Sequence, residues 1–472
     1  MPPAEIDLLT IARGSVTAPA GCGKTQLIAE ALVAYQGTKP ILILTHTNAG
    51  VASLRGRLER AGVPAQRYRL YTIDGWSMRI ISTFPARSAH NPAILRLENA
   101  RTDYPAIRDA AWRLLQAGHV NEVIQASYAQ LIVDEYQDCS VPQHQITCWL
   151  SAVLPTCVLG DPLQAIFGFQ GNALADWVSA VCAHFPVVGE LHTPWRWRNA
   201  NAEAFGQWLL HARSELIAGR PVDVRTGPEQ VTWIQLAGPE DHAQRLAAAR
   251  TAAPTVDGRV LIIGDSINPG GQQNVASQTP GAVTVEAVDL RDLVAFGRSF
   301  DLASVNVLRD LLAFAQTVMV NLGMPAFLQR LDSLTRGTAR NPASESENFA
   351  LAFRQVPTYA AAADLLLSLR QQPNVRAHRP EILRCAVKAL RLAATGVDTF
   401  QAAAIRVREE HRMLGRVLPR RAVGSTLLLK GLEAEVAVIL NGDSLNAANL
   451  YVAMTRGSMR LVVCSVNPLL GG

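Results

Sequence analysis

Short apolar runs recur along the first 190 residues, and longer amphipathic stretches separate them. Runs of four or five apolar residues are typical of strands buried on both faces, and the stretches between them are typical of helices. The alternation of strand and helix predicts a parallel sheet covered by helices. The strands are expected just before residue 18 and at 40–44, 130–133, 157–160 and 187–191.

A second set of apolar runs predicts a second sheet in the later part of the chain. Its strands are expected at 231–236, 259–265, 434–440 and 460–466. Because these runs flank residues 300–420, whose apolar positions recur at helical spacing, that stretch is expected to be a helical insertion. The glycine-rich stretch 268–281 is expected to be a flexible loop.

Composition narrows the class of protein only a little. The 472 residues include 44 Lys and Arg against 39 Asp and Glu, and the net charge of +5 permits binding to nucleic-acid phosphates without requiring it. Lysine stands only at 24, 39, 388 and 430, so each lysine is a candidate for a specific role. The seven cysteines include no C-x-x-C pair, which argues against a zinc site or disulfides and favours a reduced compartment. With no secretory signal at the N-terminus and no apolar run of ~18 residues, we expect a cytoplasmic protein without a membrane partner.

The stretch APAGCGKT, residues 18–25, has the form of a phosphate-binding loop between a strand and a helix. Gly21 and Gly23 allow backbone N–H groups to close on phosphate oxygens, Lys24 would reach the terminal phosphates, and the Thr25 hydroxyl would bind Mg²⁺. Ala18 stands where the strict pattern has glycine, so a glycine-rich turn without a ligand is the alternative. The residues expected to hold the nucleotide are Ala20, Gly21, Cys22, Gly23, Lys24, Thr25 and Gln26.

Two carboxylates follow the apolar run at 131–133, in the stretch LIVDEYQD. In a parallel sheet the end of such a strand lies beside the phosphate loop. Asp134 is expected to hold Mg²⁺, and Glu135 to orient or deprotonate the attacking water. The alternative is a solvated acidic turn, and the phosphate-binding pattern at residues 18–25 argues against it.

Further stretches resemble, in order along the chain, the motifs of superfamily 1A DNA helicases of the UvrD/Rep/PcrA type. DEYQD has the form of that family's second motif, and the other matches are ILTHTNAGVASLRGRL (43–58), TIDGWSMRI (72–80), LGDPLQAIFGFQG (159–171), PWRWRN (194–199), LLKGLEAEVAVIL (428–440) and LYVAMTRGSMRLVV (450–463). The resemblance implies an α/β fold with two RecA-like parallel-sheet motor domains in tandem and small helical insertions. It would place the first motor domain at 1–190 with a short insertion at about 77–127, the second at 191–299 and 421–472, and a helical insertion at 300–420.

The same resemblance assigns roles in ATP binding and hydrolysis. Gln164 would sense the γ-phosphate, and Arg196 and Arg456 would stabilise charge on the transferring phosphoryl group. Trp195 would stack on adenine, and Glu433 would accept hydrogen bonds from the ribose. The cofactors expected are ATP and Mg²⁺, and the catalytic residues are Lys24, Asp134, Glu135, Gln164, Arg196 and Arg456.

A nucleic-acid strand would be held mainly by aromatic residues. Phe167 and Phe169 would form platforms for unstacked bases, although burial under a sheet edge is the alternative for both rings. The other residues expected to contact DNA are Thr45, His46, Thr47, Asn48, Thr72 and Trp76.

Several positions depart from the family pattern. No glutamine precedes the phosphate loop, so strict selection of adenine is not expected. His46 and Leu427 replace an aromatic and a histidine, and Asp74 and Gln170 replace a histidine and an arginine. The ATP-hydrolysis residues are nearly intact while strand-contact residues differ, which favours translocation or switching over vigorous unwinding.

The sequence therefore predicts an ATP-dependent DNA helicase or translocase on single-stranded or partly duplex DNA, moving 3′ to 5′ if it follows the family. The alternative is an ATP-dependent regulatory subunit that binds DNA and switches a partner nuclease in DNA repair or antiviral defence. A compact helicase accompanies an OLD-family nuclease in Gabija-type phage defence, which makes that kind of partner a candidate. The DEYQD form disfavours an RNA-directed motor.

Overall fold

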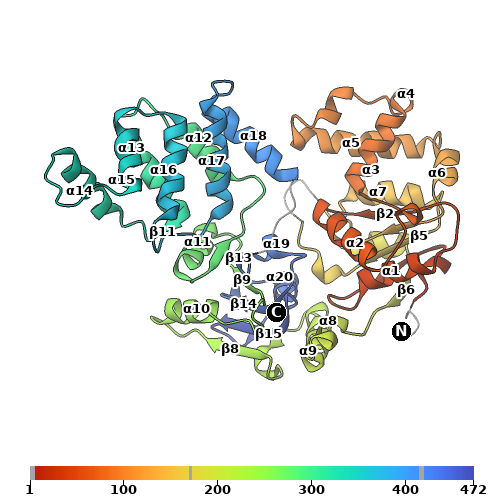
Figure 1. Cartoon of the computed structure of the whole chain (residues 1–472). Coiled ribbons are helices and arrows are strands. Elements are labelled where there is room, and N and C mark those ends of the chain that lie inside the picture. Colours follow the sequence, from red (N-terminus) through yellow and green to blue (C-terminus); the bar gives the residue numbers. More distant parts are fainter. Residues whose placement is uncertain (1–5, 169–172, 414–418) are drawn as a thin grey trace. The chain divides into compact units, whose positions relative to one another are not determined.

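The computed structural model describes residues 6–168, 173–413 and 419–472 (Figure 1). By its internal contacts the chain forms two compact units, Met1–Gln235 with Gly442–Gly472, and Leu236–Asn441. The residues predicted to bind and hydrolyse ATP lie in the first unit, apart from Glu433, which lies in the second.

Six parallel strands form the first sheet, in the order β3-β2-β4-β5-β1-β6. Each strand predicted in this part of the chain is present, and one further strand, β3, was not predicted. The bounds are β1 Arg13–Thr17, β2 Ile41–Thr45, β3 Tyr68–Thr72, β4 Leu131–Val133, β5 Thr156–Gly160 and β6 Val187–Glu190.

Helices cover both faces of this sheet, because successive residues of a buried strand point to opposite sides. On β2, Ile41 and Ile43 pack in one apolar cluster with helices α1 and α2, whereas Leu42 and Leu44 pack in another with α3, α5 and α7. These helices are α1 Lys24–Ala34, α2 Asn48–Arg60, α3 Ile73–Thr83, α5 Ala100–Gln116 and α7 Val141–Ser151. Shorter helices in the same part are α4 Pro85–Ser88 and α6 Asn121–Ser127.

The first unit also contains elements from both sides of the second unit in sequence. Helices α8 Trp195–Asn199 and α9 Glu203–Ile217 follow the first sheet, and α20 Ala447–Met454 comes from the end of the chain. Helix α20 contacts α9 and the short turn Pro162–Gln164 that follows β5. Segments distant in sequence therefore lie next to the carboxyl ends of the first sheet's strands. A short antiparallel pair joins β7 Val222–Asp223 to β16 Leu469–Leu470.

The second sheet has six strands in the order β10-β13-β9-β14-β15-β8. The pairs β10–β13, β13–β9, β9–β14 and β15–β8 run parallel. The predicted fold class, α/β with two parallel sheets and helical insertions, is thus confirmed. The strands are β8 Val231–Gln235, β9 Val260–Gly264, β10 Ala282–Thr284, β13 Arg421–Ser425, β14 Ala434–Ile439 and β15 Gly457–Ser465; α10 Asp241–Ala249 and α19 Thr426–Leu429 connect them.

The expected loop at 268–281 is instead mostly a helix, α11 Pro269–Gln278. Asn268 caps it, because its side-chain oxygen accepts a hydrogen bond from Gly271 N at 2.8 Å, and Pro269 occupies the first turn. The prediction weighed the glycines of this stretch and overlooked its Asn-Pro start signal.

Helices between β10 and β13 build a hydrophobic core of their own (Figure 1). Phe296 stacks on Phe314 with ring centroids 3.8 Å apart, and Phe400 meets Phe296 edge to face at 5.2 Å. The helices are α12 Arg291–Ser299, α13 Val307–Val318, α14 Met324–Thr335, α15 Glu345–Gln355, α16 Tyr359–Gln371, α17 Pro380–Ala394 and α18 Phe400–Met413; β11 Met319–Val320 pairs with β12 Arg376–Ala377.

A buried ion pair ties this helical core to the sheet. Arg379, at the start of α17, donates two hydrogen bonds to Glu286 beyond β10, at 2.7 and 2.8 Å. It also donates to Asp292 in α12 at 2.6 Å. Because Arg379 and Glu286 are both buried, each charge depends on the other.

We expect Arg379→Met to lower the free energy of unfolding by about 3–5 kcal/mol, because it leaves the Glu286 carboxylate buried without its partner. Chemical denaturation would measure the loss. The double variant Glu286→Leu, Arg379→Met should recover most of it. Arg391→Met, which breaks an exposed pair with Asp364, is the control and should cost less than about 1 kcal/mol. Equal losses for Arg379→Met and the control would contradict this role.

Candidate nucleotide-binding and strand-contact site

The phosphate loop connects β1 to α1, and its glycines adopt conformations that other residues rarely take. Gly21 has φ +71° and Gly23 has φ +90°, and Gly23 is the N-cap of α1. Helix α8 lies against the loop: a Cβ on Gly23 would approach Trp195 Cδ1 to 3.0 Å, and one on Gly21 would collide with the ring of Trp197. Glycine at these positions therefore serves the close approach of α8 as well as the turn.

Lys24, the first residue of α1, lies between the two predicted acidic residues. Its ammonium nitrogen is 3.0 Å from Asp134 Oδ1 and 2.6 Å from Glu135 Oε1. Burial disfavours the charged ammonium, but the two carboxylates outweigh this and hold the pKa of Lys24 above its ordinary value. The phosphate loop and the acidic end of β4 thus form one charged cluster.

Glu135 has φ +56°, a left-handed conformation that is uncommon for a residue with a side chain. Gln137 Nε2 donates a hydrogen bond to Glu135 Oε2 at 2.5 Å, and Asp161 N donates to Gln137 Oε1 at 3.2 Å. Gln137 therefore links the acidic loop after β4 to the end of β5. The sequence analysis gave Gln137 no role, and only its place inside DEYQD could have suggested one.

Gln164 is buried in the turn after β5, and its Nε2 donates to Asp161 Oδ2 at 3.0 Å. Tyr451 of α20 is buried nearby, and its hydroxyl accepts a hydrogen bond from Ala20 N in the phosphate loop at 3.1 Å. The turn that carries Gln164 and the phosphate loop therefore both contact α20. Tyr451 was also missed by the sequence analysis, because a contact over such a separation leaves no local pattern.

The two predicted arginines lie in segments that meet the phosphate loop. Arg196 N donates to Gly21 O at 3.0 Å, and Arg196 Nη1 donates to Thr455 O at 2.6 Å. Arg456 is 3% exposed, and its Nε donates to Val452 O at 2.8 Å. The structure thus brings α8, the end of α20 and the loop together.

Trp195, Gln26 and Glu433 were also predicted to contact the nucleotide, and each has different neighbours. Trp195 is half-buried and has Arg198 Cζ 5.1 Å from its ring centroid. Gln26 Nε2 donates to Glu30 Oε1 along α1 at 2.9 Å. Glu433 is exposed in the second unit, between α19 and β14.

Several predicted strand-contact residues gather where β2 and β3 end side by side. Thr45 and Thr72 are paired in register, and Thr45 is buried. The Thr47 hydroxyl caps α2 by accepting from Gly50 N at 3.0 Å, and the Thr72 hydroxyl caps α3 by accepting from Gly75 N at 2.9 Å. Asn48, the first residue of α2, is exposed.

His46 and Phe167 bring two distant motifs together, with ring centroids 5.5 Å apart and planes tilted by 49°. Both side chains are half-buried. Phe167 is thus not sealed in a core. The prediction for Phe169 lies outside the described residues.

Trp76 is not placed to contact a strand, which corrects the prediction for this residue. It is 1% exposed and packs in the cluster under α3, because Ile73, Trp76 and Ser77 share the core face of that helix. Its neighbour Asp74 accepts two hydrogen bonds from Arg108 of α5, both at 2.7 Å. Trp76 and Asp74 therefore both serve contacts between helices.

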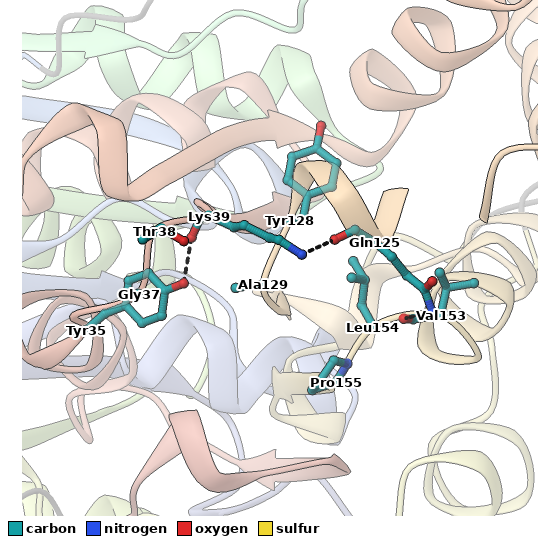
Figure 2. A pocket seen from close by; sticks show the side chains of 10 residues that line it. All are labelled: Tyr35, Gly37, Thr38, Lys39, Gln125, Tyr128, Ala129, Val153, Leu154 and Pro155. Atoms are coloured by element: carbon teal, nitrogen blue, oxygen red, sulfur yellow. Dashed lines mark hydrogen bonds between the residues drawn. The ribbon is translucent and has the colours of Figure 1, made fainter. Parts of the chain in front are cut away.

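A cavity of about 430 Å³ lies at the opposite edge of the sheet, near the starts of β2, β4 and β5 (Figure 2). Lys39 crosses it and donates to Gln125 O at 2.8 Å, while the Tyr35 hydroxyl donates to Lys39 O at 2.6 Å. No predicted site residue lines it, and Lys39 there joins α6 to the start of β2. Ligands of open parallel sheets bind at the carboxyl ends of the strands, which is the other edge.

Comparison with known proteins identifies one segment. Residues 94–179 match the UvrD/REP helicase N-terminal domain. This segment contains Asp134, Glu135, Gln164 and Phe167, whereas the phosphate loop lies before it. The match agrees with the resemblance to UvrD-type helicases drawn from the motifs.

A solved structure of arterivirus nonstructural protein 10, a helicase in complex with DNA, is similar with 10% sequence identity and a TM-score of 0.36. The alignment covers 97% of this chain and 61% of that chain, so this chain spans about three fifths of the viral helicase's length. Curated protein sequences give no match.

Among the residues described, none of the helices has the length and apolarity to cross a bilayer. In the same residues, no cluster of three or more His, Cys, Asp or Glu side chains could hold a metal ion. Thr25 and Asp134, the two residues predicted to hold Mg²⁺, carry a hydroxyl and a carboxylate. A hydroxyl and a carboxylate are oxygen ligands of the kind that Mg²⁺ prefers.

Tyr136 connects the acidic loop to a half-buried histidine, His144. Its hydroxyl is hydrogen-bonded to His144 Nδ1 at 2.8 Å, and burial raises the pKa of Tyr136 well above its usual value. Burial, with a smaller contribution from His184, lowers the pKa of His144 to about 4. The folded state therefore binds fewer protons than the unfolded state as pH falls from about 6.5 toward 4, and stability declines across that window.

We expect His144→Gln to show a smaller drop in melting temperature between pH 7 and pH 5 than the unaltered protein, because Gln does not titrate. Some drop should persist, since burial also lowers the pKa of His378 to about 4. The control is His242→Gln at an exposed position, which should keep the full drop. Identical drops in both variants would contradict the role of His144.

Proposed function

We propose that the protein is an ATP-dependent DNA helicase or translocase of the superfamily 1A type that moves on single-stranded DNA. The observation that carries the proposal is the position of Lys24, at a helix N-terminus and within 3.0 Å of Asp134 and Glu135. A cation, a metal-binding carboxylate and a candidate base at one point are what phosphoryl transfer from a nucleotide needs. The match of residues 94–179 to a helicase domain supports the same class.

In this proposal the backbone N–H groups of the loop and the Lys24 ammonium hold the phosphates of ATP. Thr25 and Asp134 hold Mg²⁺, which neutralises charge on the phosphate oxygens when bound. Glu135 accepts the proton of the attacking water, and Gln137 keeps its carboxylate in place. Arg196 and Arg456 stabilise charge on the phosphoryl group. Trp195 stacks on the base.

His46 and Phe167 form the proposed contact with bases, because they join the end of β2 to the loop that follows Gln164. A strand held there would lie next to the turn that carries Gln164, the proposed phosphate sensor, so nucleotide binding and strand binding would be coupled. Movement 3′ to 5′ is proposed from the resemblance to UvrD-type helicases.

A second candidate function is a regulatory ATPase that binds DNA and switches a nuclease partner, such as an OLD-family enzyme in antiviral defence or DNA repair. The packing of Trp76 and the pairing of Asp74 with Arg108 favour it, because both side chains are withdrawn from strand contact. Fewer strand contacts would weaken a processive motor more than a switch.

Lys24→Ala should abolish ATP hydrolysis, since the loop loses its cation. Glu135→Gln should still bind nucleotide but hydrolyse it at least ~100-fold more slowly, the scale of a lost general base. Phosphate release with Mg²⁺ and single-stranded DNA measures both rates. The chain offers a matched control in Lys39→Ala, at the opposite edge of the sheet, which should keep the full rate. Hydrolysis by Lys24→Ala at the unaltered rate would refute the assignment of the site.

Phe167→Ala should weaken single-strand binding by about 1–3 kcal/mol, the contribution of one stacked base, while basal hydrolysis persists. DNA stimulation of hydrolysis should fall with it. The assay is ATP hydrolysis against oligonucleotide length, with a melting curve to detect a packing defect. Trp149→Ala, an exposed aromatic on α7, should bind DNA normally. An unaltered protein that responds to no strand of any length would favour the switching function.

A further inference from the structure

A buried arginine on α9 lies behind the predicted phosphate sensor. Arg213 is 6% exposed, and its Nε and Nη2 lie 3.1 and 3.0 Å from Asp161 Oδ1. Its third nitrogen, Nη1, donates to Glu190 Oε1 at 2.8 Å. Arg213 therefore holds the ends of β5 and β6 together through their carboxylates.

Asp161 passes this interaction on to Gln164. Asp161 is 0% exposed, and the oxygen that does not face Arg213 accepts the hydrogen bond from Gln164 Nε2 at 3.0 Å. A glutamine amide is nearly symmetric in shape but not in charge, since one end donates hydrogen bonds and the other accepts them. The ionised Asp161 can only accept, so it fixes which end of the Gln164 amide is the nitrogen.

The orientation of that amide matters for an anionic ligand. A phosphate oxygen accepts hydrogen bonds, so the nitrogen end of the amide attracts it and the carbonyl end repels it. A carboxylate as buried as Asp161 needs a compensating charge to stay in place, and Arg213 supplies it. The order of dependence runs from Arg213 to Asp161 to Gln164.

Tyr451 connects the surroundings of Arg213 with the phosphate loop. Tyr451, whose hydroxyl accepts from Ala20 N, interacts electrostatically with both Asp161 and Arg213. Helix α9 follows α8, which carries Trp195 and Arg196. The Arg213 guanidinium itself contacts the carboxylates of Asp161 and Glu190.

We infer that Arg213 is a positioning residue for nucleotide hydrolysis, acting through Asp161 to fix the orientation of the Gln164 amide. The inference rests on the proposed ATPase function and assigns a residue outside the motifs that suggested it. Arg213 does not itself touch the nucleotide, so its loss should affect the rate of hydrolysis more than the affinity for ATP.

The test compares Arg213→Met with the unaltered protein. We expect kcat to fall at least ~10-fold, within the range for disturbing one transition-state hydrogen bond, while the Kd for ATP changes less than about threefold. In a Gln164→Ala background, Arg213→Met should lower kcat no further, since both changes act on the position of the same Gln164 amide. Arg213→Lys should be intermediate, because lysine restores the charge but not the planar fork. Arg220→Met, which breaks an exposed pair with Glu215, is the control and should leave kcat unchanged.

Loss of Arg213 could also damage folding, so a second variant removes the buried charge imbalance. Asp161→Asn combined with Arg213→Met should melt closer to the unaltered protein than Arg213→Met does, yet keep the low kcat. A normal kcat in this double variant, or an equal further loss of kcat in the Gln164→Ala background, would overturn the role of Arg213. Absence of ATP hydrolysis in the unaltered protein would instead overturn the proposed function on which the inference rests.

Discussion

The charged cluster of Lys24, Asp134 and Glu135 is the interaction on which the arrangement of the first unit depends. Two adjacent carboxylates at the end of β4 repel each other, and the ammonium of Lys24 compensates both of them. That compensation requires α1 to start at this point, which requires the tight glycine turn before it. The turn in turn leaves room for α8, whose tryptophans rest on Gly21 and Gly23. A single charge balance thus links strand, loop and two helices.

The buried side chains behind this cluster work as connectors. Gln137 joins the loop after β4 to the end of β5, Asp161 joins β5 to Gln164, and Tyr451 joins the phosphate loop to α20. All three are buried, and Gln137 and Asp161 each have hydrogen-bond partners in two different segments, so a displacement of one segment affects the other. Connections of this kind are what a nucleotide-driven protein needs to transmit the state of its phosphates to the rest of the unit.

Local pattern was sufficient for most of the buried strands. It failed for β3, where Arg69 interrupts the apolar run, for β10, which has only three residues, and for β13, where small residues replace large apolar ones. The adjacency of Lys24 and Asp134 was predictable, since parallel strands end at one edge. The contact of Tyr451 with Ala20 spans 431 positions, and the burial of Trp76 depends on helices α5 and α7, so neither leaves a local trace. The predicted domain boundaries and nucleotide-site roles stay predictions, as do the DNA contacts of Thr45, His46, Thr47, Asn48, Thr72 and Phe167.

The strand order of the first sheet also affects how the protein folds during its synthesis on the ribosome. β1 is made first among the six strands, yet its neighbours β5 and β6 are made last. At typical synthesis rates of about 5–20 residues per second, β1 waits roughly 10–30 s for its first partner. Throughout that interval β1 lacks both of the strands between which it lies in the folded sheet. The glycine loop is therefore translated early but fixed in place late.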